Sequence, residues 1–279
     1  MSAATIAFGA LVVGRALFAR HRTLGAKRKT SFRKAVVNLR TRGFAFGGLG
    51  VVPRALTESA LAEVQLQYKQ AGEHKEINTP ERRRDFYLKW AGATRSVVEL
   101  VIREWAAAEH SPLHNQFGIN VSAQIVELSC LVSLPSAAAQ VWHCDHTDGG
   151  VGDLVSFGVP LVDITRDMGP LEVGDGEFCN LANFVERVMS KKGAPTVLGV
   201  AKRGHVFAWD NFVRHRASAN TSTKVRWVLY FSVLFVPEMP SVGGGSLLSE
   251  YGFSLGSIAK ILQSAELEGR RTDAKKLRK

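Results

Sequence analysis

The sequence predicts an α+β fold in which N-terminal helices precede an antiparallel sheet system of the barrel or jelly-roll type. Two helical patterns come first, within residues 57–110. After residue 118 the chain changes to short stretches rich in β-branched and aromatic residues, broken by Gly, Pro and Asp. Helices followed by a run of short strands are typical of α+β proteins, and irregularly spaced strands suit a barrel or jelly roll.

The first 35 residues differ from the rest of the chain. Residues 3–14 form an apolar run that Arg15 interrupts, and a basic flank follows. A membrane-spanning helix needs about 20 mostly apolar residues, so this run is short. An Arg-rich leader without acidic residues resembles an organelle transit peptide. A membrane anchor with a cytoplasmic basic flank, and an untargeted extension of a cytoplasmic protein, are the alternatives.

The net charge of +11 originates in residues 1–57, which include this segment. Residues 1–57 contain eleven of the 36 Lys and Arg residues and none of the 25 Asp and Glu residues. The remainder therefore carries 25 basic against 25 acidic residues. A neutral body argues against a basic groove across the folded domain, so no nucleic-acid partner is expected.

The elements are predicted in order along the chain. Residues 43–52 form an early strand and turn. Residues 57–75 form an amphipathic helix with Thr57 or Ser59 as its N-cap. Residues 78–85 form a polar linker. A second helix covers residues 96–110. The apolar faces of the two helices consist of Leu61, Val64 and Tyr68, and of Val97, Leu100, Val101 and Trp105.

The β-rich part of the chain supplies the strands, which are predicted within residues 120–135, 154–165, 205–213 and 224–237. A terminal helix is expected at residues 256–269, between Ser257 as N-cap and Gly269 as stop signal. The three cysteines are too few and too scattered for a disulfide framework, so we expect free thiols in a reducing compartment.

A cluster of metal-ligand residue types lies in QVWHCDH, residues 140–146. On an extended chain, His143 and Asp145 project to one side and Cys144 to the other. His215 is the best candidate for a third ligand. Two histidines and one carboxylate form the facial triad of non-haem Fe(II) oxygenases, but zinc hydrolases use the same ligand types.

Arg226 favours iron. It shares a predicted strand face with Val228, Tyr230 and Ser232. An arginine among inward apolar residues is rarely buried without an anion, and a guanidinium suits bidentate pairing with a carboxylate. An iron ion chelated by a 2-oxo acid, with Arg226 holding the far carboxylate, accounts for all four residues.

Three segments carry a resemblance to a known family: QVWHCD, VPLVDITRDMGPLEV and RGHVFAWDNFVRHRASANTSTKVRWVLYFSV. In order and spacing they resemble the phytanoyl-CoA dioxygenase family of Fe(II)- and 2-oxoglutarate-dependent oxygenases, over about residues 40–237. The resemblance implies a double-stranded β-helix, the cupin-like jelly roll, braced by N-terminal helices. It also implies iron ligands His143, Asp145 and His215, with 2-oxoglutarate anchored by Arg226.

The resemblance extends to the turn before Arg226. Asn220 and Ser222 match the family motif and are expected to belong to the co-substrate-binding site with Arg226, where they shape the turn that presents it. The chain departs from the family at residues 173–178, which are interpreted as a loop near the primary substrate. Asp145 favours hydroxylation, because related halogenases replace this carboxylate with a small residue.

The predicted activity follows from these residues. The chain is expected to use Fe(II), 2-oxoglutarate and O2 to hydroxylate a small-molecule or lipid-like substrate, with release of succinate and CO2. Two rival interpretations are a non-catalytic module that binds metal or 2-oxoglutarate, and a membrane- or RNA-binding protein acting through its basic tail. The expected organisation is a targeting or anchor segment (1–35), a dioxygenase domain (36–245) and a C-terminal helix with a basic tail (246–279).

Overall fold

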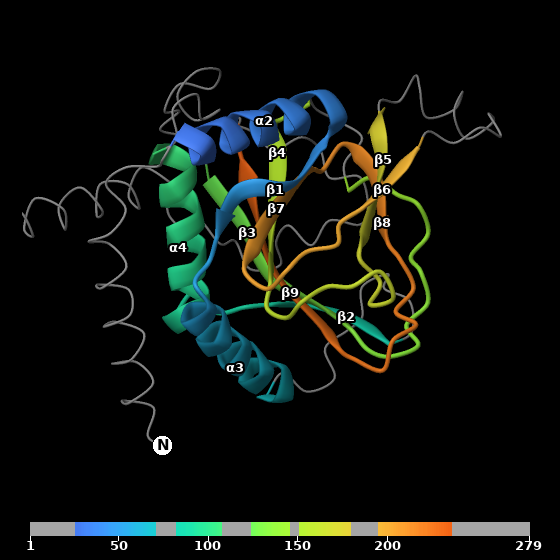
Figure 1. Cartoon of the computed structure of the whole chain (residues 1–279). Coiled ribbons are helices and arrows are strands. Elements are labelled where there is room, and N and C mark those ends of the chain that lie inside the picture. Colours follow the sequence, from blue (N-terminus) through green and yellow to red (C-terminus); the bar gives the residue numbers. More distant parts are fainter. Residues whose placement is uncertain (1–25, 71–81, 108–123, 146–150, 180–194, 236–279) are drawn as a thin grey trace, which may run out of the picture.

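The computed structural model describes residues 26–70, 82–107, 124–145, 151–179 and 195–235 (Figure 1). Helices come mainly from the first part of the chain and strands from the second. The elements are α2 (Ala26–Arg42), β1 (Phe44–Val51), α3 (Arg54–Gln70), β2 (Arg83–Tyr87), α4 (Gly92–Ala107), β3 (Gln124–Ser133), β4 (Leu154–Pro160), β5 (Leu171–Phe178), β6 (Thr196–Leu198), β7 (His205–Asp210), β8 (Val213–Ala217) and β9 (Arg226–Leu234).

The described strands form two antiparallel sheets. The larger has the order β1-β7-β4-β9-β3-β2, and the smaller has the order β6-β5-β8. Neighbours in both sheets are far apart in the sequence; for example, Phe44 of β1 pairs with Trp209 of β7. This is the predicted mixed fold with a jelly-roll core, and it places the predicted site between the sheets.

Strand alternation divides the large sheet into two faces. In β9, Trp227, Leu229 and Phe231 belong to the core under the helices. Val228 and Tyr230 belong to a second cluster, together with Val173 of the small sheet. Because neighbouring residues of a strand point to opposite faces, one strand contributes both to the helix-covered core and to the space between the sheets.

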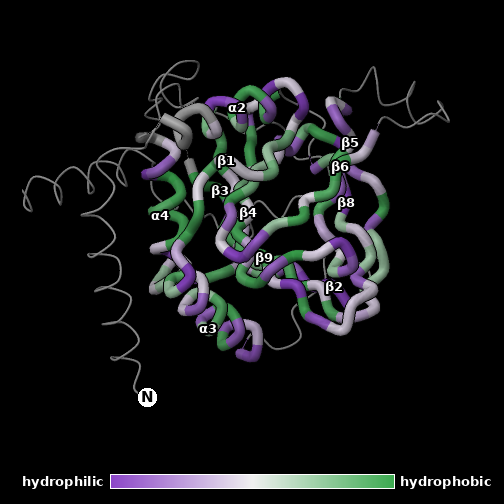
Figure 2. Tube along the Cα trace, in the orientation of Figure 1, coloured by the Kyte–Doolittle hydropathy of each residue, from purple (hydrophilic) through white to green (hydrophobic). Residues whose placement is uncertain are grey.

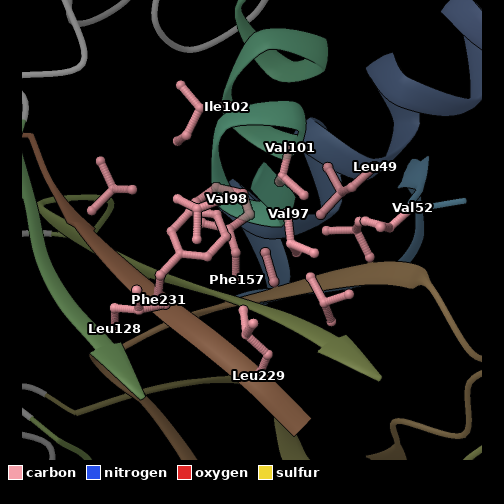
Figure 3. Close-up of a cluster of buried hydrophobic side chains, with 14 of the residues drawn as sticks. Leu49, Val52, Val97, Val98, Val101, Ile102, Leu128, Phe157, Leu229 and Phe231 are labelled. Carbon is pink, nitrogen blue, oxygen red and sulfur yellow. The ribbon is translucent and has the colours of Figure 1, made fainter. Parts of the chain in front are cut away.

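The helices cover the outer face of the large sheet. Figure 3 shows Val97, Val98 and Val101 of α4 directed toward Phe157 of β4 and Phe231 of β9. These side chains are fully buried, and their spacing matches one face of a helix. Along the helices, hydrophobic and hydrophilic residues alternate (Figure 2), as expected for elements that bury one side. The apolar stripe of α4 therefore fixes the sheet that carries the site.

Two predicted helices are present with shifted boundaries. α3 begins at Arg54, directly after Pro53, so Thr57 and Ser59 do not cap it. The Thr57 hydroxyl instead donates to the carbonyl of Arg54 (2.8 Å), within the first turn. α4 begins at Gly92, four residues before the predicted start. The faces are correct, with Val64, Val97, Val101 and Trp105 buried.

The prediction of a linker over residues 78–85 is wrong for its last three residues. Arg83–Tyr87 form β2, the edge strand of the large sheet, and Arg83 pairs with Ser133 of β3. Three consecutive arginines concealed the strand, because alternation is not visible when the inward residue is itself charged. The interpretation of residues 173–178 as a loop is also wrong. They belong to β5, which has a register shift between Val173 and Phe178.

The boundary drawn at residue 35 falls inside α2. Phe32, Ala35, Val36 and Leu39 of this helix are buried against the body of the protein. In the part of the chain that the structure describes, no helix combines the length and apolar character needed to cross a membrane. The apolar run at residues 3–14 and the predicted helix at 256–269 lie outside the described residues.

Candidate active site

The His-x-Asp segment lies against β8 as its antiparallel neighbour. The amide of His143 donates to the carbonyl of His215 (3.0 Å), and the amide of His215 donates back to His143 (2.8 Å). The amide of Asp145 donates to the carbonyl of Asn211 (3.1 Å). These bonds bring two segments about 70 residues apart in the sequence into register.

The three predicted metal ligands converge at this contact. One ligand atom from each of His143, Asp145 and His215 lies within 4.8 Å of the others. Nε2 of His143 is 3.7 Å from Oδ1 of Asp145, and Nε2 of His215 is 3.5 Å from Oδ2. One ion placed between them would meet two imidazole nitrogens and a carboxylate on one side.

Both imidazoles are oriented through their other nitrogen. Nδ1 of His143 lies 2.8 Å from the carbonyl of Val141, and Nδ1 of His215 lies 2.8 Å from the carbonyl of Val213. A carbonyl only accepts, so Nδ1 carries the proton in each ring and Nε2 keeps its lone pair toward the site. Burial lowers the pKa of His215, which keeps that lone pair available at neutral pH.

A cavity between the sheets joins the three ligands to Arg226. Its walls include apolar residues from both sheets, among them Phe207, Val228 and Leu171. Trp209 of β7 lines it as well. Arg226 stands at the start of β9, and His215 stands on β8 of the other sheet. The cavity is thus enclosed by two layers.

Arg226 is a buried cation without a described counter-charge. The residue is 3% exposed, and its Nε has no hydrogen-bond partner among the residues that the structure describes. Burial, together with the neighbouring Arg83, lowers the pKa of Arg226 to about 9. A buried guanidinium is costly unless an anion pairs with it. A carboxylate entering the cavity would supply that anion.

Asn220 and Ser222 lie in the turn before β9. The Asn220 amide donates to the carbonyls of Ser133 and Lys224, each at 2.9 Å. Its Oδ1 accepts from the hydroxyl of Ser222 at 2.7 Å. These contacts match the expected turn-shaping role, and they occupy the polar atoms of both side chains. The structure places neither residue in the cavity wall, so direct contact with a co-substrate is not part of this arrangement.

The sequence analysis missed a half-buried acidic pair that lines the same cavity. The Tyr230 hydroxyl lies 2.7 Å from Asp85 and 2.7 Å from Glu127. Burial raises the pKa of Glu127 to about 6 and that of Asp85 well above its ordinary range. One hydroxyl hydrogen serves one acceptor, so a proton held by the pair satisfies the second contact. Glu127 could have been found as the one charged residue in the predicted strand at 120–135. Asp85 could not, because residues 78–85 were predicted to be a polar linker.

The expectation of three free thiols is wrong. Cys144 and Cys179 are joined as a disulfide across 35 residues of sequence, with Cα atoms 6.5 Å apart. Cys130 is free and buried. Cysteine spacing cannot reveal such a pair, because the pairing depends on how β5 and the His-x-Asp segment meet. The bond ties the residue between two predicted ligands to the end of β5.

Comparison with known proteins gives one family. The profile of the family described as phytanoyl-CoA dioxygenase (PhyH) matches residues 47–228, which is well over half of the chain. The match includes His143, Asp145, His215 and Arg226. No curated protein sequence matches the chain.

Solved structures of similar fold were found at low sequence identity. The crystal structure of AviO1 from Streptomyces viridochromogenes Tue57 superposes with a TM-score of 0.55 at 15% identity, covering 77% of this chain and 97% of that one. SnoN, a non-heme alpha ketoglutarate dependent epimerase from nogalamycin biosynthesis, gives 0.58 at 14%, covering 82% and 96%. HygX from Streptomyces hygroscopicus, with nickel and 2-oxoglutarate bound, gives 0.51 at 17%, covering 72% and 86%. At these identities the likeness shows the fold.

Proposed function

The chain belongs to the phytanoyl-CoA dioxygenase family, whose members use Fe(II), 2-oxoglutarate and O2, and on this premise we propose that it is an Fe(II)- and 2-oxoglutarate-dependent dioxygenase. Its reaction is hydroxylation of a small organic or lipid-like substrate. One observation carries the proposal: the His143, Asp145 and His215 ligand atoms and the uncompensated guanidinium of Arg226 line the same cavity.

The residues present fit both groups. His143, Asp145 and His215 would hold Fe(II), with the co-substrate bound beside it in the same cavity. Arg226 would pair with the far carboxylate of 2-oxoglutarate, in a contact that also compensates its own burial. The bound iron supplies O2 activation coupled to oxidative decarboxylation, which releases succinate and CO2.

The chain's own residues set the conditions for this chemistry. The protonated Nδ1 atoms hold both imidazoles with Nε2 toward the metal position. Phe207, Val228 and Leu171 contribute apolar surface to a cavity wall that also carries polar and charged groups, so the cavity can contact both apolar and polar parts of a substrate. Asp145 supplies a carboxylate where a halide site would need a small residue, which supports hydroxylation.

Anaerobic titration of the full-length protein with Fe(II) and 2-oxoglutarate tests the cofactor chemistry without a known substrate. The expected signal is a visible metal-to-ligand charge-transfer band that His143→Ala abolishes and Arg226→Ala weakens. Lys202→Ala, which changes an exposed lysine paired with Asp163, is the control and should leave the band unchanged. A folded wild-type protein that binds Fe(II) and 2-oxoglutarate without the band would overturn the proposal.

Admission of O2 then separates an enzyme from a non-catalytic binding module. An enzyme releases succinate, and the release accelerates with a compound from a panel of small-molecule and lipid-like substrates. A module forms the band and releases no succinate with any of them. The structural relatives include a protein described as an epimerase, so product identification by mass is part of the experiment.

We also propose that the N-terminal residues direct the chain to an organelle or a membrane. The supporting observation is the apolar run at residues 3–14 followed by a basic flank without acidic residues. Because α2 begins at Ala26, a reporter should be fused after residue 25 rather than within the helix. A diffuse cytosolic reporter would reject both targeting and anchoring.

A further inference from the structure

A stacked group of three side chains lies behind the candidate metal ligands. The guanidinium carbons of Arg214 and Arg216 each lie 4.6 Å from the ring centroid of Trp142. Trp142 directly precedes His143, and the two arginines directly flank His215. Each member of the stack is therefore covalently adjacent to a predicted ligand.

Strand alternation explains why the stack and the ligands lie on opposite sides. In an extended segment successive side chains point to opposite faces. His143 and His215 face the cavity, so Trp142, Arg214 and Arg216 face away from it. The cavity wall accordingly contains the two histidines and none of the three stacked residues. The stack acts on the site through the backbone, without touching it.

The two arginines are themselves anchored on the neighbouring strand. Arg214 pairs with Glu177 at 3.1 Å, and Arg216 pairs with Glu172 at 2.7 Å. Both glutamates lie on β5, which pairs with β8 in the small sheet. These ion pairs limit the motion of the guanidinium planes. Trp142 is thus held by groups that are already fixed to the sheet.

The segment that carries His143 and Asp145 is held to β8 and the residues just before it by backbone hydrogen bonds from the amides of Gln140, His143 and Asp145. Its contact with β8 is an isolated bridge at His143 and His215, not a continuous ladder. Val141, the residue before Trp142, is 82% exposed. These backbone bonds set the register of the segment, and side-chain contacts further restrict how its residues are oriented. The stack at Trp142 and the disulfide at Cys144 supply them on the outer side.

We propose that Trp142 is a positioning residue whose stacking between Arg214 and Arg216 aligns the His143-x-Asp145 segment with His215 and thereby sets the metal affinity. The inference rests on the proposed metal site. Cation–π contacts are individually weak, but both act on the same ring and on the segment that carries two of three ligands. Loss of groups that orient metal ligands commonly weakens metal binding by about 10–100-fold.

The test measures metal affinity and the spectrum in the full-length protein. Trp142→Leu removes the aromatic face, Trp142→Phe retains one, and Leu66→Ala changes an exposed apolar residue of α3, away from the cavity, as a control. Fe(II) binding is measured anaerobically by calorimetry, and the charge-transfer band is recorded with 2-oxoglutarate. We expect Trp142→Leu to raise the Kd about tenfold or more and to shift or broaden the band. Trp142→Phe should recover most of the affinity, and Leu66→Ala should match wild type.

Unfolding of the metal-free variants separates positioning from general stability. A positioning role predicts that Trp142→Leu weakens metal binding more than its unfolding temperature explains, and that Trp142→Phe rescues binding. Wild-type affinity in Trp142→Leu, or equal loss in the Leu and Phe variants, overturns the inference. If Trp142→Leu does not fold, the double variant Arg214→Lys with Arg216→Lys takes its place, because it keeps the charges but removes the planar faces. It should raise the Kd for Fe(II) in the same way, and wild-type affinity in this variant overturns the inference.

Failure of this inference is distinguishable from failure of the proposed function. If the wild-type protein binds no Fe(II) and forms no band, both the proposed function and this inference are overturned. If the wild-type protein forms the band and Trp142→Leu forms it equally well, only the positioning role is overturned.

Discussion

His143 and His215 face each other across a reciprocal pair of backbone hydrogen bonds, of 3.0 and 2.8 Å. Their rings lie with centroids 4.6 Å apart, and Asp145 reaches between their Nε2 atoms. The ligand set is thereby assembled by the backbone register of two segments rather than by flexible side chains. A site built in this way is preorganised, because the sheet fixes the ligands before any ion arrives.

Substitution of Arg226 should weaken 2-oxoglutarate binding. Arg226→Lys keeps a charge but cannot form the bidentate contact, and Arg226→Met removes the charge. A hydrogen bond to a charged group contributes about 1.5–3 kcal/mol, so Arg226→Met should raise the Kd of 2-oxoglutarate by about 10–100-fold, with Arg226→Lys in between. Calorimetric titration of the metal-loaded variants measures this.

The matched control for Arg226 is Arg203→Met. Arg203 pairs with Glu58 on the surface, outside the cavity. It should leave 2-oxoglutarate binding unchanged. In the metal-free protein Arg226→Met should also raise the unfolding temperature, since an uncompensated buried cation is removed. Equal 2-oxoglutarate affinity in Arg226→Met and wild type would contradict the assigned role.

The carboxyl of Glu127, half-buried in the cavity wall, should make stability depend on pH. Burial raises its pKa from 4.5 to about 6. Because the folded-state pKa is raised, the stabilising contribution is complete below about pH 4.5 and is lost as pH rises through about 6. The difference corresponds to about 2 kcal/mol. Glu127→Gln, which is neutral at all pH values, should therefore gain stability over wild type progressively between about pH 4.5 and 6.5.

Denaturant unfolding in the presence of a chelator, at several pH values, checks this behaviour. Glu58→Gln provides a control of opposite sign, because hydrogen bonding to Arg54 lowers the pKa of Glu58. Its effect should be small, since both groups are exposed. A constant stability difference between wild type and Glu127→Gln across the pH range would show that the carboxyl titrates normally.

Gly158 permits the cavity wall to form. A Cβ at this position of β4 would lie 2.3 Å from the ring of Phe207 on β7, and that ring is buried and lines the cavity. Gly158→Ala should therefore cost about 1–3 kcal/mol of stability and push the ring toward the cavity, which impairs 2-oxoglutarate binding.

The double variant Gly158→Ala with Phe207→Leu isolates this clash. A smaller side chain at position 207 gives the new methyl group room, so the double variant should lose less stability than the sum of the two single variants. Thermal unfolding of the four proteins completes the cycle. Additive losses would mean that the two residues do not interfere.

The disulfide between Cys144 and Cys179 should stabilise the oxidised protein. A closed loop of 35 residues corresponds to about 4 kcal/mol in the chain-entropy view. Cys179→Ser should therefore unfold at a lower temperature than wild type without reductant, and the two should converge when reductant is added. Cys130→Ser, which changes the buried free cysteine, should remain sensitive to reductant. Three titratable thiols in the unreduced, unfolded wild-type protein would contradict the pairing.

The sequence by itself determined the residue types that make the site and the strands that carry them. His-x-Asp at 143–145, His215 and Arg226 were recognisable because ligand types and spacing are local properties. Alternation along residues 226–232 predicted that Arg226, Val228 and Tyr230 share one face of the strand, and all three line the cavity. These features depend on neighbours in the chain, and the sequence displays such neighbours directly.

The tertiary structure alone decided the contacts between distant segments. It brought Asp85 and Glu127 to the hydroxyl of Tyr230, joined Cys144 to Cys179, and placed two arginines over the ring of Trp142. It also made a strand of the arginine-rich residues at 83–87, because an edge position beside β3 outweighs their weak strand pattern. The physical reason is common to these cases. Sheet register and the crossing of layers fix which side chains meet, and neither is encoded in the periodicity of any one segment.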